Sequence, residues 1–332
     1  MEIYMESLIF ALEAVMPIVI MVAIGYFIKR IGFVKAELAK TVNKMVFRIF
    51  LPAMLFLNVY KIESLAEVEL DYVLYSVIAT VAVFGLSIPV IMLASDRGER
   101  RGALLQACFR SNYALIGIPL AQSLFGEAGV KVATLLSAAS IPLLNMLAVI
   151  SLSIFGGAGE KPSVKKILLG IAKNPLIQSV LLGLAVLGIR SVFVRYGISF
   201  RIADIKPVYT ALGYLSNLAT PLALLMLGVQ FEFSAVGEMK REIVTGTLMR
   251  TVAVPILGLG VAYLFFRSSF DGAKFAALVA LFGTPVAVSS VPMAQEMGAD
   301  TTLAGQLVVW TTLLSAFTVF IASFLLKSAG VF

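Results

Sequence analysis

Ile118-Pro119-Leu120-Ala121-Gln122 lies in an apolar stretch long enough to cross a bilayer, and a near copy, Val291-Pro292-Met293-Ala294-Gln295, lies in another. A proline inside a helix removes a backbone donor and clashes with the preceding turn, so we expect both helices to be interrupted near their middles. Backbone that is freed at membrane depth is tolerated only where protein or a water-filled cavity satisfies it. Two interrupted helices at matching positions in two halves of a chain indicate the binding site of a secondary transporter.

The composition indicates an integral membrane protein. The chain has 332 residues, of which 60% are hydrophobic and only 14% are charged, whereas about a quarter of the residues in soluble domains are charged. A single water-soluble core cannot hide that much apolar surface. The first apolar stretch, residues 7–28, is long enough to span, follows an acidic front and lacks a small-residue cleavage site, which argues against a removable signal peptide.

Several function classes are excluded by residues that the chain lacks. It has one cysteine, Cys108, and no histidine, so disulfides, thiolate or histidine metal sites and a Ser-His-Asp triad are impossible. Without H-E-x-x-H, G-x-S-x-G or Walker A patterns, we expect no enzyme, no cofactor and no direct use of ATP. The net charge of +7 arises from scattered Lys and Arg, which suits contact with the lipid bilayer and not with nucleic acid.

Apolar windows of about 20 residues predict an all-α membrane fold with ten transmembrane helices, at residues 7–28, 38–59, 71–94, 102–125, 131–155, 164–189, 205–229, 241–266, 271–297 and 300–326. A Gly- and Lys-containing link, 156–163, divides the chain into two five-helix repeats, 1–155 and 164–332. The matching positions of Pro52 and Pro221 support the repeat. Because five is odd, the second repeat must enter the membrane inverted.

The distribution of basic residues predicts the orientation. Lys and Arg gather at the links 29–35, 97–101, 161–166 and 240–241, which the positive-inside rule places in the cytoplasm. The link 190–206 carries basic residues on the other side and opposes this assignment. We expect a multi-pass protein of the plasma membrane with both termini extracellular.

The two interrupted spans, 102–125 and 271–297, each predict a pair of half-helices. We expect linkers at 112–118 and 284–291, with each second half-helix beginning at the proline of its motif, since proline is well tolerated at the first helical position. Each of those helices presents an amino end with about half a positive charge to the membrane centre. Two such ends form an anion site that needs no buried cation and suits a carboxylate.

Amides and hydroxyls at the breaks are the candidate ligands for that carboxylate. Asn112 is the strongest, because its NH2 group can donate to a carboxylate oxygen. The alternative, in which the prolines only kink the helices for packing, is weakened by repetition of the whole motif. The other candidate substrate-binding residues are Ser111, Pro119, Ser140, Asn145, Thr284, Ser289, Ser290 and Pro292.

Arg110 lies deep in its span, where a charge costs at least about 2.5 kcal/mol and should have a partner. Either it clamps a substrate carboxylate, or it forms an internal ion pair or lines a cavity, with Asp71, Glu13 or Glu296 as partner. The same three carboxylates are the candidates for proton or ion coupling. Glu13 also fits the headgroup level, and Asp71 also fits a helix cap.

The chain resembles the auxin efflux carrier family, which includes plant auxin carriers and prokaryotic malonate carriers. The resemblance covers nearly the whole sequence and is most specific in Asn112-Tyr113-Ala114-Leu115-Ile116-Gly117-Ile118-Pro119; it also includes Leu51-Pro52-Ala53-Met54-Leu55-Phe56, Asn174-Pro175-Leu176-Ile177 and residues 284–298. It implies that the interrupted fourth and ninth helices cross and that Asn112 contacts the substrate carboxylate. It further implies a dimerising scaffold of helices one, two, six and seven, and a transport unit of helices three to five and eight to ten.

Three positions depart from the plant pattern. Leu55 replaces a serine, Ser140 replaces a glutamine, and Arg110 has no counterpart. The departures argue against a pocket shaped for an indole ring, and Arg110 would suit a second carboxylate, as in malonate.

We therefore expect a secondary transporter of a small organic anion, an auxin-like acid or a malonate-like dicarboxylate. It would work by alternating access with an elevator movement, as a homodimer. The alternatives are a sodium-coupled organic-anion symporter of the bile-acid type and a membrane sensor that binds a ligand without moving it.

Overall fold

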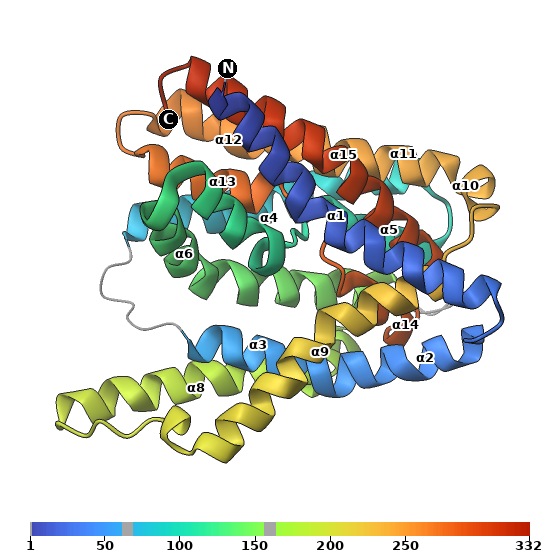
Figure 1. Cartoon of the computed structure of the whole chain (residues 1–332), viewed down its shortest axis with the longest axis horizontal. Coiled ribbons are helices and arrows are strands. Elements are labelled where there is room, and N and C mark those ends of the chain that lie inside the picture. Colours follow the sequence, from blue (N-terminus) through green and yellow to red (C-terminus); the bar gives the residue numbers. More distant parts are fainter. Residues whose placement is uncertain (1, 62–68, 156–163) are drawn as a thin grey trace.

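The computed structural model describes residues 2–61, 69–155 and 164–332, so the proposed link 156–163 lies outside the described residues. Within these ranges the chain is helical and contains no β-strand, and its helices pack side by side (Figure 1). Both ends of the chain lie at the same end of the molecule (Figure 1).

The elements follow one another with short connections. In chain order they are α1 (Glu2–Arg30), α2 (Ala36–Met45), η1 (Val46–Phe50), α3 (Leu51–Tyr60), α4 (Leu70–Ala94), α5 (Gly98–Phe109), η2 (Tyr113–Gly117), α6 (Ile118–Phe155), α7 (Val164–Lys173), α8 (Pro175–Arg195), η3 (Ile202–Asp204), α9 (Lys206–Gln230), α10 (Ala235–Glu238), α11 (Lys240–Leu248), η4 (Met249–Ala253), α12 (Val254–Phe266), α13 (Gly272–Gly283), α14 (Ser290–Glu296) and α15 (Thr301–Ser328).

Seven helical segments among the described residues are long and apolar enough to cross a membrane, which confirms the all-α membrane fold. They are Glu37–Tyr60, Leu70–Ala94, Tyr113–Phe155, Pro175–Arg195, Lys206–Gln230, Lys240–Phe266 and Thr301–Ser328. The predicted span 271–297 is not among them, because α13 has 12 residues and α14 has 7. The predicted boundary between spans 102–125 and 131–155 coincides with a break in α6, where the backbone of Phe125 and Gly126 is non-helical.

Three five-residue π-helical turns, η1, η2 and η4, precede prolines at the same spacing. Pro52, Pro119 and Pro255 each stand two residues after such a turn ends. Proline has no N–H, and its ring clashes with the carbonyl four residues earlier. A wider π turn at that carbonyl relieves the clash, so the helix passes through the proline instead of ending there.

Both interruptions are present, but their bounds differ from the predicted linkers 112–118 and 284–291. α5 ends at Phe109 and the helical path resumes at Tyr113, six residues before the predicted start at Pro119. The π turn η2 is the reason, since it allows this proline to lie inside a helix. α14 begins at Ser290, two residues before the predicted start at Pro292.

The predicted helix 164–189 is also divided. Asn174 stands before Pro175 in an extended conformation and its side chain accepts a hydrogen bond from the N–H of Leu176 at 2.9 Å, which caps α8. The residue before a proline is disfavoured in the α conformation, so a new helix begins here. α8 then extends to Arg195, beyond the predicted end.

α1 and α9 cross at two glycines. A Cβ atom on Gly25 would lie 2.1 Å from the Leu225 carbonyl oxygen, and one on Gly228 would lie 2.1 Å from the Val22 carbonyl oxygen. Small residues at such crossings let the helix backbones approach closely, which is how helices associate where lipid removes the hydrophobic driving force.

Gly228→Ala should therefore destabilise the protein, by about 1–3 kcal/mol as for other overpacked sites. Thermal unfolding of the detergent-purified protein measures the change. Gly213→Ala is the matched control on the same helix, because nothing lies within 4 Å of its Cβ position. A melting temperature that falls equally for both variants would show that close approach is not the cause.

Candidate functional site

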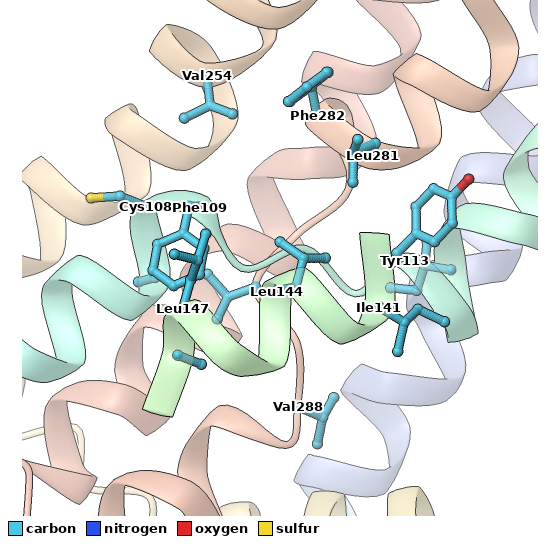
Figure 2. Packing of buried hydrophobic residues seen from close by; sticks show 14 of the residues in the cluster. Cys108, Phe109, Tyr113, Ile141, Leu144, Leu147, Val254, Leu281, Phe282 and Val288 are labelled. Carbon is cyan, nitrogen blue, oxygen red and sulfur yellow. The ribbon is translucent and has the colours of Figure 1, made fainter. Parts of the chain in front are cut away.

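The two linkers cross and are hydrogen bonded to each other. The N–H of Asn112 donates to the Pro285 carbonyl at 2.8 Å, and the N–H of Ala287 donates to the Arg110 carbonyl at 3.2 Å. Ser111 and Val286 thus face each other as an antiparallel bridge. Figure 2 shows the extended segments that follow Phe109 and Phe282 passing one another. Each linker satisfies the backbone that the other exposes.

A cavity of about 50 Å³ lies beside the crossing. It is bounded by residues 110–115, by residues 287–289 and by parts of α3, α6 and α9. Since one water needs about 10–15 Å³ of such space, the cavity has room for a few small groups.

Arg110 is held in this cavity by neutral oxygens. Its Nη2 donates to Asn145 Oδ1 and to Ser289 Oγ, both at 2.8 Å, and its Nη1 donates to Ser290 Oγ at 3.4 Å. The side chain is only 4% exposed. No carboxylate among the described side chains pairs with it.

The acidic partners expected for Arg110 lie elsewhere or outside the described side chains. Glu296 pairs with Arg48 at 3.2 Å. Asp71 is exposed near the start of α4 and borders an apolar groove between α4 and α12. The side chain of Glu13 is outside the described residues.

Two buried polar groups at the crossing have no hydrogen-bond partner among the described residues. They are the Nδ2 of Asn112 and the Oγ of Ser111, each on a residue that is 4% exposed. A buried polar group left without a partner costs about 1–3 kcal/mol. Both residues border the cavity, so water or a bound ligand there can supply partners.

The predicted site residues fall into two groups. Arg110, Ser111, Asn112, Asn145 and Ser289 border the cavity, and Ser290 contacts the guanidinium. The others do not border the cavity: Ser140 is buried on α6, Thr284 bonds back to the Ala280 carbonyl at 2.8 Å, and Pro119 and Pro292 lie within helices.

Sequence reasoning overlooked three residues near the crossing. Asn58 of α3 and Thr220 of α9 border the cavity from the opposite side. Arg250 of η4 is completely buried and donates to the carbonyl oxygens of Phe109, Leu281 and Thr284. A charge in the middle of the apolar span 241–266 is the same signal that singled out Arg110.

The long apolar helices define a multi-pass membrane protein. The family model described as membrane transport protein matches residues 10–161 and 159–323, so the chain belongs to this family. This confirms the resemblance to the auxin efflux carriers. A transporter family is not an enzyme class.

Two archaeal proteins are similar to this chain. An uncharacterized transporter of Methanothermobacter thermautotrophicus is 25% identical over 306 residues, which cover 91% of this chain and 94% of that protein. An uncharacterized transporter of Methanocaldococcus jannaschii is 27% identical over 223 residues, which cover 66% of this chain and 68% of that protein.

Asn112→Ala should not lower the stability of the protein, because no described residue accepts a hydrogen bond from its side-chain amide. Asn145→Ala should cost about 1–3 kcal/mol, because it removes an acceptor for the buried guanidinium and a donor to the Ile141 carbonyl. Thermal unfolding of the two variants compares amides at the same cavity. A larger loss for Asn112→Ala would show that this side chain has a structural role.

Proposed function

We propose that the protein is a secondary transporter of a small organic anion whose carboxylate binds at the crossing of the two linkers. The observation that carries the proposal is a buried guanidinium, Arg110, without a carboxylate partner among the described side chains, beside the unpaired amide of Asn112. A buried charge without a counter-charge is costly. An anion in the cavity would supply the counter-charge and accept the free amide hydrogens.

The backbone adds to this attraction. Tyr113, Ala114 and Leu115 begin the helix that continues into α6, and all three border the cavity. The first N–H groups of a helix have no acceptor within that helix, and they lie at the positive end of its dipole. The sequence predicted that two helix ends would attract the anion without the need for a buried cation. Because α14 is short, its end contributes little, and Arg110 supplies the positive charge in its place.

The size of the cavity favours short acids. At about 10–15 Å³ per water, the space corresponds to about three to five water molecules. This suits a short-chain acid better than an acid that carries an indole ring. Asn112 and Arg110 both border the cavity, so a malonate-like dicarboxylate would place one carboxylate at each.

Transport would proceed by alternating access. In the proposed arrangement the scaffold comprises α1, α2–α3, α7–α8 and α9, and the transport unit comprises α4, α5–α6, α11–α12, α13–α14 and α15. Each other pair counts as one span, and α5–α6 counts as two because the backbone of Phe125 and Gly126 divides α6. This gives ten crossings in two inverted repeats. An even number agrees with chain ends that lie at the same end of the molecule (Figure 1).

A cluster of neutral amides joins the two proposed bodies. Asn43 Nδ2 donates to Gln230 Oε1 at 2.8 Å and to Gln295 Oε1 at 3.2 Å, and Gln295 Nε2 donates to the Lys40 carbonyl at 2.9 Å. Gln230 Nε2 also donates to Gln295 Oε1 at 3.4 Å, so the cluster attaches α14 to α2 and α9. The bonds to α14 would have to break when the transport unit moves, so they would act as a gate in the proposed cycle.

The direct test is uptake of labelled malonate into vesicles that contain the purified protein. We expect saturable uptake that Asn112→Ala abolishes while the variant still purifies folded. Asn58→Ala, which also lies at the cavity, is the control for simple loss of a polar lining residue. Malonate that binds and is not taken up would identify a sensor, and unchanged affinity in Asn112→Ala would remove this residue from the site.

Arg110→Gln should weaken dicarboxylates more than monocarboxylates. A hydrogen bond to a charged group contributes about 1.5–3 kcal/mol, which corresponds to a loss of affinity of about ten- to a hundredfold. Binding of malonate and propionate to the purified variant measures the difference. Arg48→Gln is the control, because Arg48 is an exposed arginine that pairs with Glu296. Equal losses for both acids would reject the second-carboxylate role of Arg110.

A further inference from the structure

Arg250 is the second buried arginine at the crossing, and it is bonded only to backbone in the described part of the chain. Its Nε donates to the Thr284 carbonyl at 2.8 Å, its Nη1 to the Phe109 carbonyl at 3.1 Å and its Nη2 to the Leu281 carbonyl at 2.9 Å. The residue has no exposed surface and does not border the substrate cavity.

The three carbonyls belong to the carboxyl ends of the two interrupted helices. Phe109 is the last residue of α5, Leu281 lies in the last turn of α13, and Thr284 follows α13 directly. The carboxyl end of a helix carries about half a negative charge. Two such ends together balance one guanidinium, which explains how the charge is tolerated without a carboxylate.

Carbonyl oxygens at the ends of interrupted helices are also what coordinates sodium in carriers with discontinuous helices. A cation at such a point neutralises the two dipoles and holds the half-helices together. In this chain Arg250 of η4 occupies the place where the two carboxyl ends meet. Its guanidinium directs three donors in fixed directions.

We propose that Arg250 is a built-in cation that takes the place of an exchangeable metal ion at the crossing. Anion binding and transport then require no sodium or other alkali cation. Arg250 is a positioning residue: the Phe109 carbonyl that it holds immediately precedes Arg110, so it fixes the segment from Arg110 to Asn112. The substrate part of this proposal rests on the proposed function.

The first experiment uses the unaltered protein in sodium, potassium and choline chloride of equal ionic strength. We expect the same melting temperature in the three salts, and a malonate dissociation constant that varies by less than about twofold. A tenfold gain in malonate affinity in sodium, or a melting temperature that rises with sodium alone, would overturn the proposal.

The second experiment removes the tethered charge. Arg250→Ala leaves three carbonyls without their donor, so its melting temperature should fall, and millimolar guanidinium or methylguanidinium should recover part of the loss. A side chain that acted only by filling space would not show this recovery. Arg48→Ala is the matched control, an exposed arginine whose loss guanidinium should not relieve. An unchanged melting temperature and malonate affinity in Arg250→Ala would overturn the proposal.

Arg250→Lys keeps the test decisive if Arg250→Ala does not fold. Lysine retains the charge but cannot direct donors to three carbonyls at once. We expect a folded protein with lowered malonate affinity, still independent of sodium. A loss of folding as complete as that of Arg250→Ala would show that the positive charge is not what stabilises the crossing.

The two proposals fail differently. If the unaltered protein binds no malonate or propionate in any salt, the proposed function is wrong, and the salt dependence and guanidinium recovery of the melting temperature still decide the role of Arg250. If malonate binds only in sodium, the transport proposal survives and the built-in cation is rejected.

Discussion

Two backbone hydrogen bonds between the linkers are the constraint on which the site depends. They join the Asn112 N–H to the Pro285 carbonyl and the Ala287 N–H to the Arg110 carbonyl. Interrupted helices expose backbone groups that lipid cannot satisfy. Here backbone groups exposed at each interruption are hydrogen bonded to the other interruption. Neither break would therefore be tolerable alone. The crossing brings four helix ends to one place, and the charges of those ends organise what surrounds them.

The two buried arginines differ in how their own positive charges are balanced. Arg250 is balanced by the carboxyl ends of α5 and α13, and its donors are occupied by backbone. Arg110 contacts only an amide oxygen and two hydroxyls, which orient the guanidinium without neutralising it. In the described structure, helix ends thus balance one positive charge, and the proposed anion would supply the counter-charge of the other.

Contacts away from the crossing suit the proposed division into a scaffold and a transport unit. Within the proposed transport unit, Arg100 forms buried ion pairs with Glu242 at 3.0 Å and with Asp300 at 3.3 Å. Removing one partner of a buried ion pair costs about 3–5 kcal/mol, so α5, α11 and the start of α15 should stay together. Between the bodies the amides of Asn43 and Gln295 contribute only about 0.5–1.5 kcal/mol per bond. The ion pair of the exposed Arg48 with Glu296 adds about 0–1 kcal/mol. A transport cycle could break and remake contacts of this strength.

By itself the sequence determined the membrane fold, the existence of two interruptions and five of the residues that line the cavity. The apolar windows, the repeated Pro119 and Pro292 motifs, and the polar run at 110–112 are local signals, each readable from neighbours along the chain. Only the tertiary structure decided where the helices resume, because the extended segments are bounded by their hydrogen bonds to each other. It also decided which oxygens surround Arg110 and that Arg250 joins two helix ends, since those partners are 31 to 180 residues away in the chain. Electrostatic partnership acts through space, and no local pattern in a sequence records it.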